Sequence, residues 1–313
     1  MHVRRLATCV EVQTPAKLNL FLEVLGKRGD GYHEIETLIV GLGLYDTLIF
    51  TPKDTHEITL HCRWALGATA ERNRTEPASA IAAINDEIPS GPQNLVWRAV
   101  ELLRNEADVR GGASLELVKR IPAAAGLGGG SSDAAAALVA ANLGWQLNWP
   151  RERLVELAAK IGSDVPFFLV GGAAICRGRG ERIERTAARR LHTVVVRPPV
   201  GISTADVYKA CQVADKRATV DRIQSALAHG APAEIARLMT NRLHSAAEGL
   251  TPWIEELKTR FEGEDELGHQ MSGSGSSYFG ICRSARSARR VAARLRARRS
   301  GAVFAATTAA AMK

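Results

Sequence analysis

The sequence has few cysteines, few aromatic residues and no long apolar run. The cysteines lie far apart and form no C-x-x-C pair or zinc-binding spacing; they are Cys9, Cys62, Cys176, Cys211 and Cys282. No apolar run approaches the roughly 18 residues that a membrane helix needs, and no signal-peptide core precedes the first strand-like segment. We therefore expect a cytoplasmic protein without disulfides, export or membrane insertion.

The composition is that of an ordinary globular protein. The 313 residues are 46% hydrophobic and 24% charged, which favours two domains over one or three. Lysine and arginine exceed the acidic residues by enough to give a formal net charge of +8. A basic surface favours anionic partners, and both phosphorylated small molecules and nucleic acid fit that description.

The first 63 residues have the pattern of a β-sheet. Alternation over 17–24 predicts a strand, with Leu18, Leu20, Leu22 and Val24 on one face and Lys17, Asn19, Phe21 and Glu23 on the other. The glycines of 29–31 predict a turn. Further strands are expected at 33–42, 46–51 and 57–63, before a polar, proline-broken surface excursion over 64–93.

The remainder mixes helices and strands. Asn94 is a candidate N-cap, and helical spacing continues after it, in an alanine-rich stretch to about residue 142, and over 154–161. Strands are expected at 114–119, 191–197, 278–282 and 302–306. We place a domain boundary near residue 190, which gives domains of 1–190 and 191–313.

One loop has the composition of a phosphate-binding site. Pro122–Asp133 reads PAAAGLGGGSSD, with four glycines in the five positions 126–130, between a predicted strand and a predicted helix. Backbone N–H groups and hydroxyls at a helix N-terminus bind anions, and glycine lets the backbone approach phosphate oxygens. The alternative is a tight turn into a helix without a ligand. The spacing fits neither the P-loop nor the dinucleotide fingerprint.

Other residues are candidates with ordinary alternatives. Asp164, in Gly-Ser-Asp-Val-Pro, could accept a proton from a substrate hydroxyl or simply cap a helix. Lys17 could be a surface lysine, and Tyr32 and His33 could be hairpin residues without a ligand. A second glycine–serine loop, Met271–Ser277, could be a flexible connector.

Taken together, these segments resemble the GHMP kinases, which include galactokinase, homoserine kinase and mevalonate kinase. The matching segments occur in order over nearly the whole chain: Pro15–Leu20, Gly31–His33, Pro122–Asp133, Gly162–Pro166 and Ser272–Gly275. The resemblance implies an α+β fold with a two-domain GHMP kinase architecture. Its N-terminal domain would be like domain 2 of ribosomal protein S5, its C-terminal domain would be ferredoxin-like, and the active site would lie in the cleft.

The segments Pro15–Leu20 and Gly31–His33 resemble most closely the family member that acts on a cytidyl diphosphate substrate. This implies ATP-dependent phosphorylation of that substrate's 2-hydroxyl in non-mevalonate isoprenoid synthesis. The alternative within the family is a kinase of the homoserine or mevalonate type. Ala124 and Ala125 depart from the family, since many members have glycine there.

The resemblance also implies roles for individual residues. Asp164 would be the base, with Lys17 beside it as a second catalytic group, and Ser131 or Ser132 would contact magnesium that arrives with ATP. The cytidyl substrate would contact Asn19, Tyr32, His33 and Tyr208. ATP would contact Asn94, Leu95, Lys119, Pro122, Gly126, Leu127, Gly128, Gly129, Gly130, Ser131 and Ser132.

The C-terminal region is rich in arginine. Eight arginines lie between Arg283 and Arg299, which by itself would suit a nucleic-acid-binding protein. An apolar stripe at helical spacing instead predicts a helix packed on the second domain with its arginines in solvent; the stripe is Ala288, Val291, Ala292 and Leu295. We therefore expect a small-molecule substrate, no nucleic acid, and a monomer or homodimer.

Overall fold

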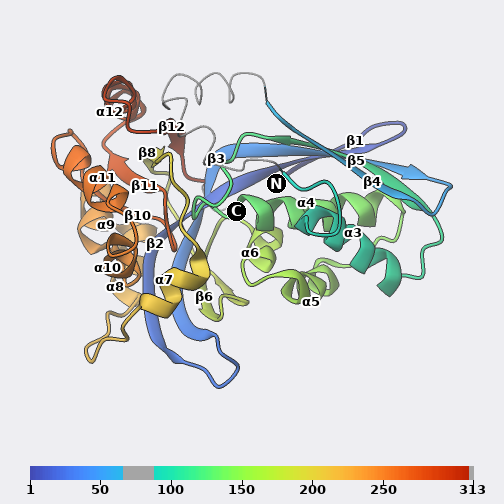
Figure 1. The fold of residues 1–313 in the computed structure, drawn as a ribbon, viewed down its shortest axis with the longest axis horizontal. Helices are drawn as coiled ribbons and strands as arrows, with labels where there is room; N and C mark the ends of the chain where they lie inside the picture. Colours follow the sequence, from blue (N-terminus) through green and yellow to red (C-terminus); the bar gives the residue numbers. More distant parts are fainter. Residues whose placement is uncertain (66–87, 310–313) are drawn as a thin grey trace.

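Two β-sheets with helices against them form the protein in the computed structural model, which describes residues 1–65 and 88–309 (Figure 1). Most of the expected surface excursion therefore lies outside the described residues. The first sheet has eight strands: β1 (His2–Arg5), β2 (Val10–Lys27), β3 (His33–Lys53), β4 (Ile58–Trp64), β5 (Gly112–Lys119), β6 (Ala173–Gly178), β7 (Arg182–Arg185) and β9 (Thr240–Asn241). The second has four, in the order β10 (Gly268–Met271), β11 (Tyr278–Cys282), β8 (His192–Arg197) and β12 (Ala302–Thr307).

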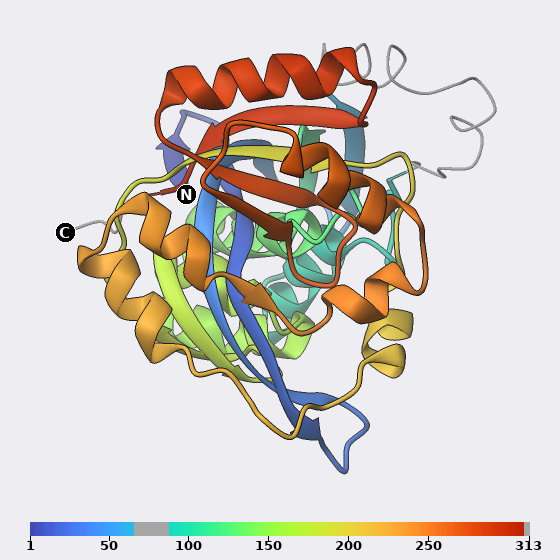
Figure 2. The same ribbon diagram turned by 90° about the vertical axis from the view of Figure 1, so that its left-hand side faces the viewer.

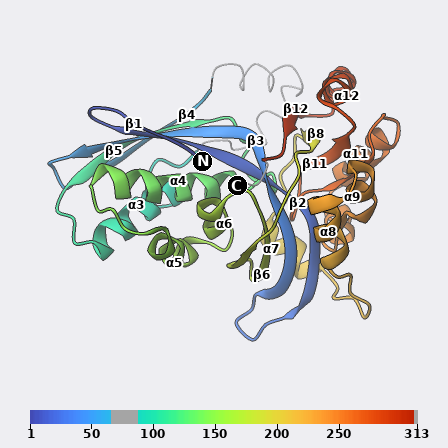
Figure 3. The same cartoon turned by 180° about the vertical axis from the view of Figure 1, so that it is seen from behind.

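The long antiparallel hairpin of β2 and β3 is the centre of the first sheet. The strands expected at 33–42 and 46–51 are one continuous strand, β3, because its residues pair with β2 along almost its full length. The predicted turn is present, with Gly31 at φ +85°. Figures 1 and 3 show that the hairpin continues well beyond the rest of the sheet and reaches past α7 (Thr204–Ala210).

The alternation predicted for 17–24 is correct only as far as residue 20. The register between β2 and β3 shifts between Asn19 and Phe21, and such a bulge moves the following side chains to the opposite face. Phe21 consequently joins Leu18 in one apolar core, while Leu22 turns to the cavity that Asn19 lines. A periodic pattern cannot reveal this irregularity, because every residue from 16 to 24 is buried.

Four helices lie on one face of the first sheet (Figures 1 and 3). They are α3 (Leu95–Glu106), α4 (Gly129–Gly144), α5 (Arg151–Ile161) and α6 (Val165–Val170). Asn94 is the N-cap of α3, as expected, since its side chain accepts a hydrogen bond from the Val96 N–H at 2.9 Å. The alanines of α4 are buried against β2 and β3 because small side chains let a helix approach a sheet closely.

The second sheet is covered by the C-terminal helices: α8 (Asp221–His229), α9 (Pro232–Leu238), α10 (His244–Glu248), α11 (Trp253–Glu262) and α12 (Ala285–Ala297). Figure 2 shows α12 as the outermost element beside β12. Its predicted apolar stripe is buried and all eight arginines of 283–299 are exposed. The predicted boundary near residue 190 lies between β7 and β8, although β9 returns to pair with β2.

All five cysteines are free. Within residues 1–65 and 88–309, none of the helices combines the length and the apolar character that crossing a membrane would demand.

Candidate active site

A cavity of about 1280 Å³ lies where the hairpin meets elements of the second half of the chain. Its lining comes from β2 and β3, the loop before α4, the N-terminus of α6, α7, and the loop 273–274. Figures 1 and 3 show these elements converging from both halves of the protein. Of the residues predicted for a site, the following line it: Lys17, Asn19, Tyr32, His33, Leu95, Pro122, Gly126, Gly128, Gly129, Gly130, Ser131, Asp164 and Tyr208.

The loop before α4 depends on glycine. Gly126 and Gly128 have φ of +69° and +71°, in the left-handed region. A Cβ on Gly126 would lie 2.2 Å from the Ser272 carbonyl oxygen, and one on Gly128 would lie 2.8 Å from the Phe168 ring. Ala124 has a φ of +48°, so an alanine occupies the left-handed conformation that favours glycine.

The same loop presents unpaired donors to the cavity. The first helical hydrogen bond of α4 runs from the Ser132 N–H to the Gly128 carbonyl at 2.9 Å. The N–H groups of the preceding residues, Gly129, Gly130 and Ser131, therefore lie in the first helical turn, where no intrahelical acceptor exists. Together with the helix dipole they form a site for anionic oxygens.

The second glycine–serine loop, Met271–Ser277, is hydrogen-bonded to the loop before α4. The Ser272 hydroxyl donates to the Gly126 carbonyl at 3.1 Å, and the Ser277 N–H donates to the Ala125 carbonyl at 3.1 Å. Two hydrogen bonds and a close backbone contact thus join loops about 150 residues apart. This excludes a flexible connector and couples the second half of the chain to the loop before α4.

Lys17 and Asp164 form a pair inside the cavity. The Lys17 Nζ lies 3.7 Å from Asp164 Oδ2 and donates to Asn19 Oδ1 at 2.6 Å. Only 5% of the Lys17 side chain is exposed, against 35% for Asp164, so Lys17 is not a surface lysine. Asp164 occupies the N-cap position of α6 without making a side-chain capping hydrogen bond, which leaves its carboxylate for the cavity.

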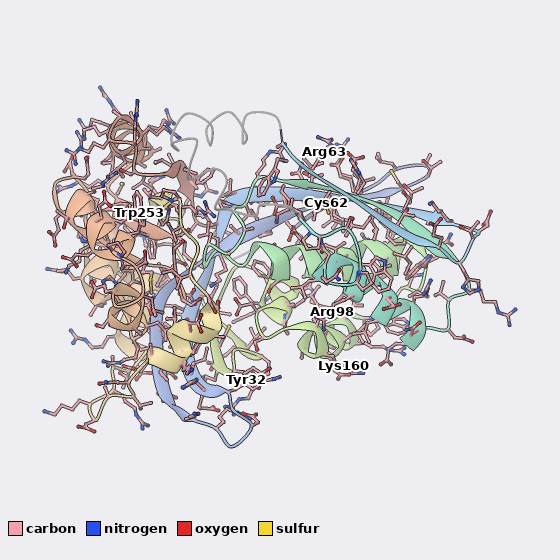
Figure 4. All side chains as sticks on the ribbon, in the orientation of Figure 1. Tyr32, Cys62, Arg63, Arg98, Lys160 and Trp253 are labelled. Carbon is pink, nitrogen blue, oxygen red and sulfur yellow. The ribbon has the colours of Figure 1, made fainter. Side chains whose placement is uncertain are left out.

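Aromatic and basic residues line the end of the cavity nearest the hairpin. The His33 and Tyr208 rings stack at 5.3 Å with an interplanar angle of 30°. Tyr32 is 53% exposed, and the Arg179 guanidinium lies 4.8 Å from its ring centroid. Figure 4 shows Tyr32 beside the hairpin, far from Cys62 and Arg63 on β4. Lys27 and Lys209, like Arg179, also line the cavity and were not predicted from the sequence.

Four residues expected at the nucleotide do not line the cavity. Leu127 is buried in an apolar core, and the Asn94 side chain caps α3. Ser132 is fully buried and donates its hydroxyl to the Pro15 carbonyl at 2.5 Å, which leaves Ser131 as the serine that faces the cavity. Lys119 is the fourth. Leu127 and Ser132 lie within the loop motif and Asn94 and Lys119 lie outside it, but the sequence does not show which of these side chains point into the cavity.

Lys119 belongs to a buried ionic cluster beneath the loop. Its ammonium donates to Asp46 and, at 2.5 Å, to Asp133, while Asp46 also accepts the N–H groups of Arg120 and Ile121. The two carboxylates keep the pKa of Lys119 above its usual value despite burial. Burial, together with the Asp46 charge, raises the pKa of Asp133 to about 8. The cluster ties β3, β5 and α4 together at the phosphate loop, and its two aspartates were not predicted.

Comparison with known proteins agrees with this geometry. The family model described as GHMP kinases N terminal domain matches residues 94–172, and that described as GHMP kinases C terminal matches residues 223–300. A solved homoserine kinase from Cytophaga hutchinsonii shares the fold, with a TM-score of 0.73 at 16% identity over 99% of this chain and 97% of its own. The chain belongs to the GHMP kinase family and is a small-molecule kinase.

The most similar relatives share one name. The 4-diphosphocytidyl-2-C-methyl-D-erythritol kinase of Pelotomaculum thermopropionicum is 43% identical over 90% of this chain and 92% of its own length. That of Alkaliphilus metalliredigens is 35% identical over 87% of each. A crystal structure of 4-(cytidine 5'-diphospho)-2C-methyl-D-erythritol kinase superposes with a TM-score of 0.75 at 35% identity, covering 96% of this chain and 99% of that one.

Proposed function

We propose that the protein transfers the γ-phosphoryl group of ATP to the 2-hydroxyl of 4-diphosphocytidyl-2-C-methyl-D-erythritol. The observation that carries the proposal is a single cavity that joins an anion-binding glycine loop, a lysine–aspartate pair and an aromatic, basic end. The relatives' names supply the substrate that fits this combination.

The geometry supports a role for each of the reacting groups. The oxygen of the 2-hydroxyl bonds to the γ-phosphorus of ATP while Asp164 accepts the hydroxyl proton. The bond between the γ-phosphorus and the bridging oxygen breaks, and ADP leaves with that oxygen. Lys17, 3.7 Å from that carboxylate, stabilises the developing charge on the alkoxide. The donor phosphates lie on the N–H groups of Gly129, Gly130 and Ser131.

Magnesium fits this site as a companion of the nucleotide. Within the described part of the chain no group of three His, Cys, Asp or Glu side chains could hold a metal, whereas the Ser131 hydroxyl lies in the cavity beside the phosphate donors. Ser131 would contact the ion, which when bound would neutralise phosphate charge. The protein's own contribution is to orient the phosphates.

The hairpin end suits the cytidyl diphosphate. Tyr32, with Tyr208 stacked on His33, offers aromatic faces for a pyrimidine, and the His33 ring nitrogens offer hydrogen bonds to its edge. The positive side chains of Lys27, Arg179 and Lys209 match the negative diphosphate. Burial raises the pKa of Tyr208, so its phenol stays neutral beside that diphosphate.

A substrate panel tests the proposal. The purified protein with MgATP is offered the full cytidyl substrate, 2-C-methyl-D-erythritol 4-phosphate, homoserine and mevalonate, and ADP release and phosphorylated product are measured. We expect rapid transfer to the cytidyl substrate alone. Equal efficiency with the truncated phosphate would mean that the hairpin end does not read cytidine, and transfer to homoserine or mevalonate instead would assign another member of the family.

A further inference from the structure

Thr37 is a buried polar residue in the wall of the cavity, with no role in the proposed chemistry so far. It lies near the start of β3, is 1% exposed, and pairs with Leu22 on one side and Cys176 on the other. Its hydroxyl donates to the Phe21 carbonyl at 2.6 Å. This contact occurs directly after the bulge of β2, where the shifted register leaves the ladder irregular.

The Thr37 hydroxyl determines which way the Asn19 amide points. A hydroxyl has one hydrogen, and that of Thr37 is used on the Phe21 carbonyl, so toward Asn19 it can only accept. The group 2.8 Å away must therefore be the Asn19 Nδ2 donor, and the amide oxygen must face the opposite way. The opposite side is occupied by Lys17, whose ammonium donates to that oxygen at 2.6 Å.

A reversed amide would remove this contact. It would direct the Asn19 NH₂ group at the Lys17 ammonium. Because both groups are donors, they cannot form a hydrogen bond with each other, and Lys17 would have to move. The space is confined, because a Cβ on Gly273 would lie 3.1 Å from both Lys17 Nζ and Asn19 Oδ1. The ammonium therefore remains between Asn19 and Asp164 only while the amide keeps its present orientation.

We infer that Thr37 is a positioning residue for phosphoryl transfer. Through the chain Phe21 carbonyl, Thr37 hydroxyl, Asn19 amide and Lys17 ammonium, it holds the charge that faces Asp164. The inference rests on the proposed roles of Lys17 and Asp164 and assigns a function to a residue whose hydroxyl is hydrogen-bonded to neither of them.

Replacement of the hydroxyl tests it. Thr37→Val keeps the branched shape of the side chain but replaces the hydroxyl with a methyl group, so the acceptor for Asn19 is lost. Thr37→Ala also removes the hydroxyl, and it places no methyl group against Asn19. We expect kcat to fall about fivefold to tenfold in both, which corresponds to the loss of one hydrogen bond, with the KM for ATP unchanged. Thr37→Ser restores the hydroxyl and should restore kcat to within about twofold of the parent.

Thr193 provides the matched control. It is a buried threonine near the start of β8, and its hydroxyl donates to the Ala306 carbonyl at 3.0 Å, away from the cavity. Thr193→Val should lower the melting temperature as much as Thr37→Val does and leave kcat unchanged. A merely structural role for Thr37 would instead give both variants the same kinetics.

The outcomes separate the inference from the proposed function. If Lys17→Ala loses activity while Thr37→Val and Thr37→Ala keep the parent's kcat, the inference is wrong and the role of Lys17 stands. A Thr37→Ser variant as slow as Thr37→Ala would also overturn it, because the hydroxyl would then not be the active group. An active Lys17→Ala enzyme would refute the proposed role of Lys17, and the inference with it.

Discussion

We predict that disrupting the buried ionic cluster lowers the stability of the folded chain. The cluster consists of Lys119, Asp46 and Asp133. Lys119→Met keeps the length and most of the volume of the side chain but removes the ammonium that bridges the two carboxylates. Asp46 keeps two backbone N–H donors after this change. Asp133 loses its ammonium donor, and its Oδ1 already has no hydrogen-bond partner among the described residues.

The cost follows from burial. Removal of one partner from a buried ion pair costs about 3–5 kcal/mol, because a charge remains in a medium that solvates it poorly. Asp133 can relieve part of this cost by keeping a proton, since its pKa is already raised to about 8. We therefore expect the loss at pH 7 to be near 3 kcal/mol, with a fall in melting temperature of roughly 5–10 °C.

The assay is differential scanning calorimetry with a matched lysine. Lys160 forms a single ion pair with Glu106 at 2.7 Å, and both side chains are about half exposed. Lys160→Met should change stability by about 1 kcal/mol at most. ATP titration of the same proteins should show weaker binding for Lys119→Met only, because the cluster supports the phosphate loop. If Lys119→Met and Lys160→Met have equal melting temperatures, the buried ionic cluster of Lys119 does not stabilise the fold.

Three further predictions concern single groups. Because the pKa of Asp133 is higher in the folded chain than in the unfolded one, its contribution to stability is complete below about pH 4 and is lost as the pH rises toward 8. The melting temperature of the parent should therefore fall more between pH 5 and pH 8 than that of Asp133→Asn. If the melting temperatures of the two proteins change in parallel with pH, the pKa of Asp133 is not raised in the folded chain. Asp164→Asn should lower kcat by roughly 10²–10⁴ with ATP affinity nearly unchanged, and turnover within a few-fold of the parent would remove Asp164 as the base. Tyr32→Ala should weaken binding of the cytidyl substrate by about 1–3 kcal/mol of stacking, seen as a raised KM, while an unchanged KM would place the cytosine elsewhere.

Sequence patterns predicted features that depend on neighbours along the chain. The cap of α3 at Asn94, the turn at Gly31 and the apolar stripe of α12 were all confirmed, because each depends on contacts within a few residues. The glycines at 126 and 128 belong to the same class, since their positive φ angles favour a residue without a Cβ. The motifs that carry the resemblance also led to the GHMP kinase family, which the comparisons confirmed.

The direction in which side chains point within those motifs depended on tertiary structure. Leu127 and Ser132 lie within the loop Pro122–Asp133 and Lys119 lies just before it, yet none of the three lines the cavity. Their side chains contact partners that other elements supply, such as Asp46 on β3 for Lys119 and the Pro15 carbonyl on β2 for Ser132. The face that Leu22 presents was mispredicted for a similar reason, since the bulge in β2 exists only against β3.

The sequence by itself determined the family, the phosphate loop and the pairing of a lysine with an aspartate as candidates. Only the tertiary structure decided that Lys17 is buried 3.7 Å from Asp164, that Asn19 holds it, and that Thr37 orients Asn19. The physical reason is that chemistry depends on distances of a few ångströms between residues that lie far apart in the sequence, such as Lys17 and Asp164. Local propensity and periodicity carry no information about such distances, which are fixed when the hairpin, the helices and the second sheet pack together.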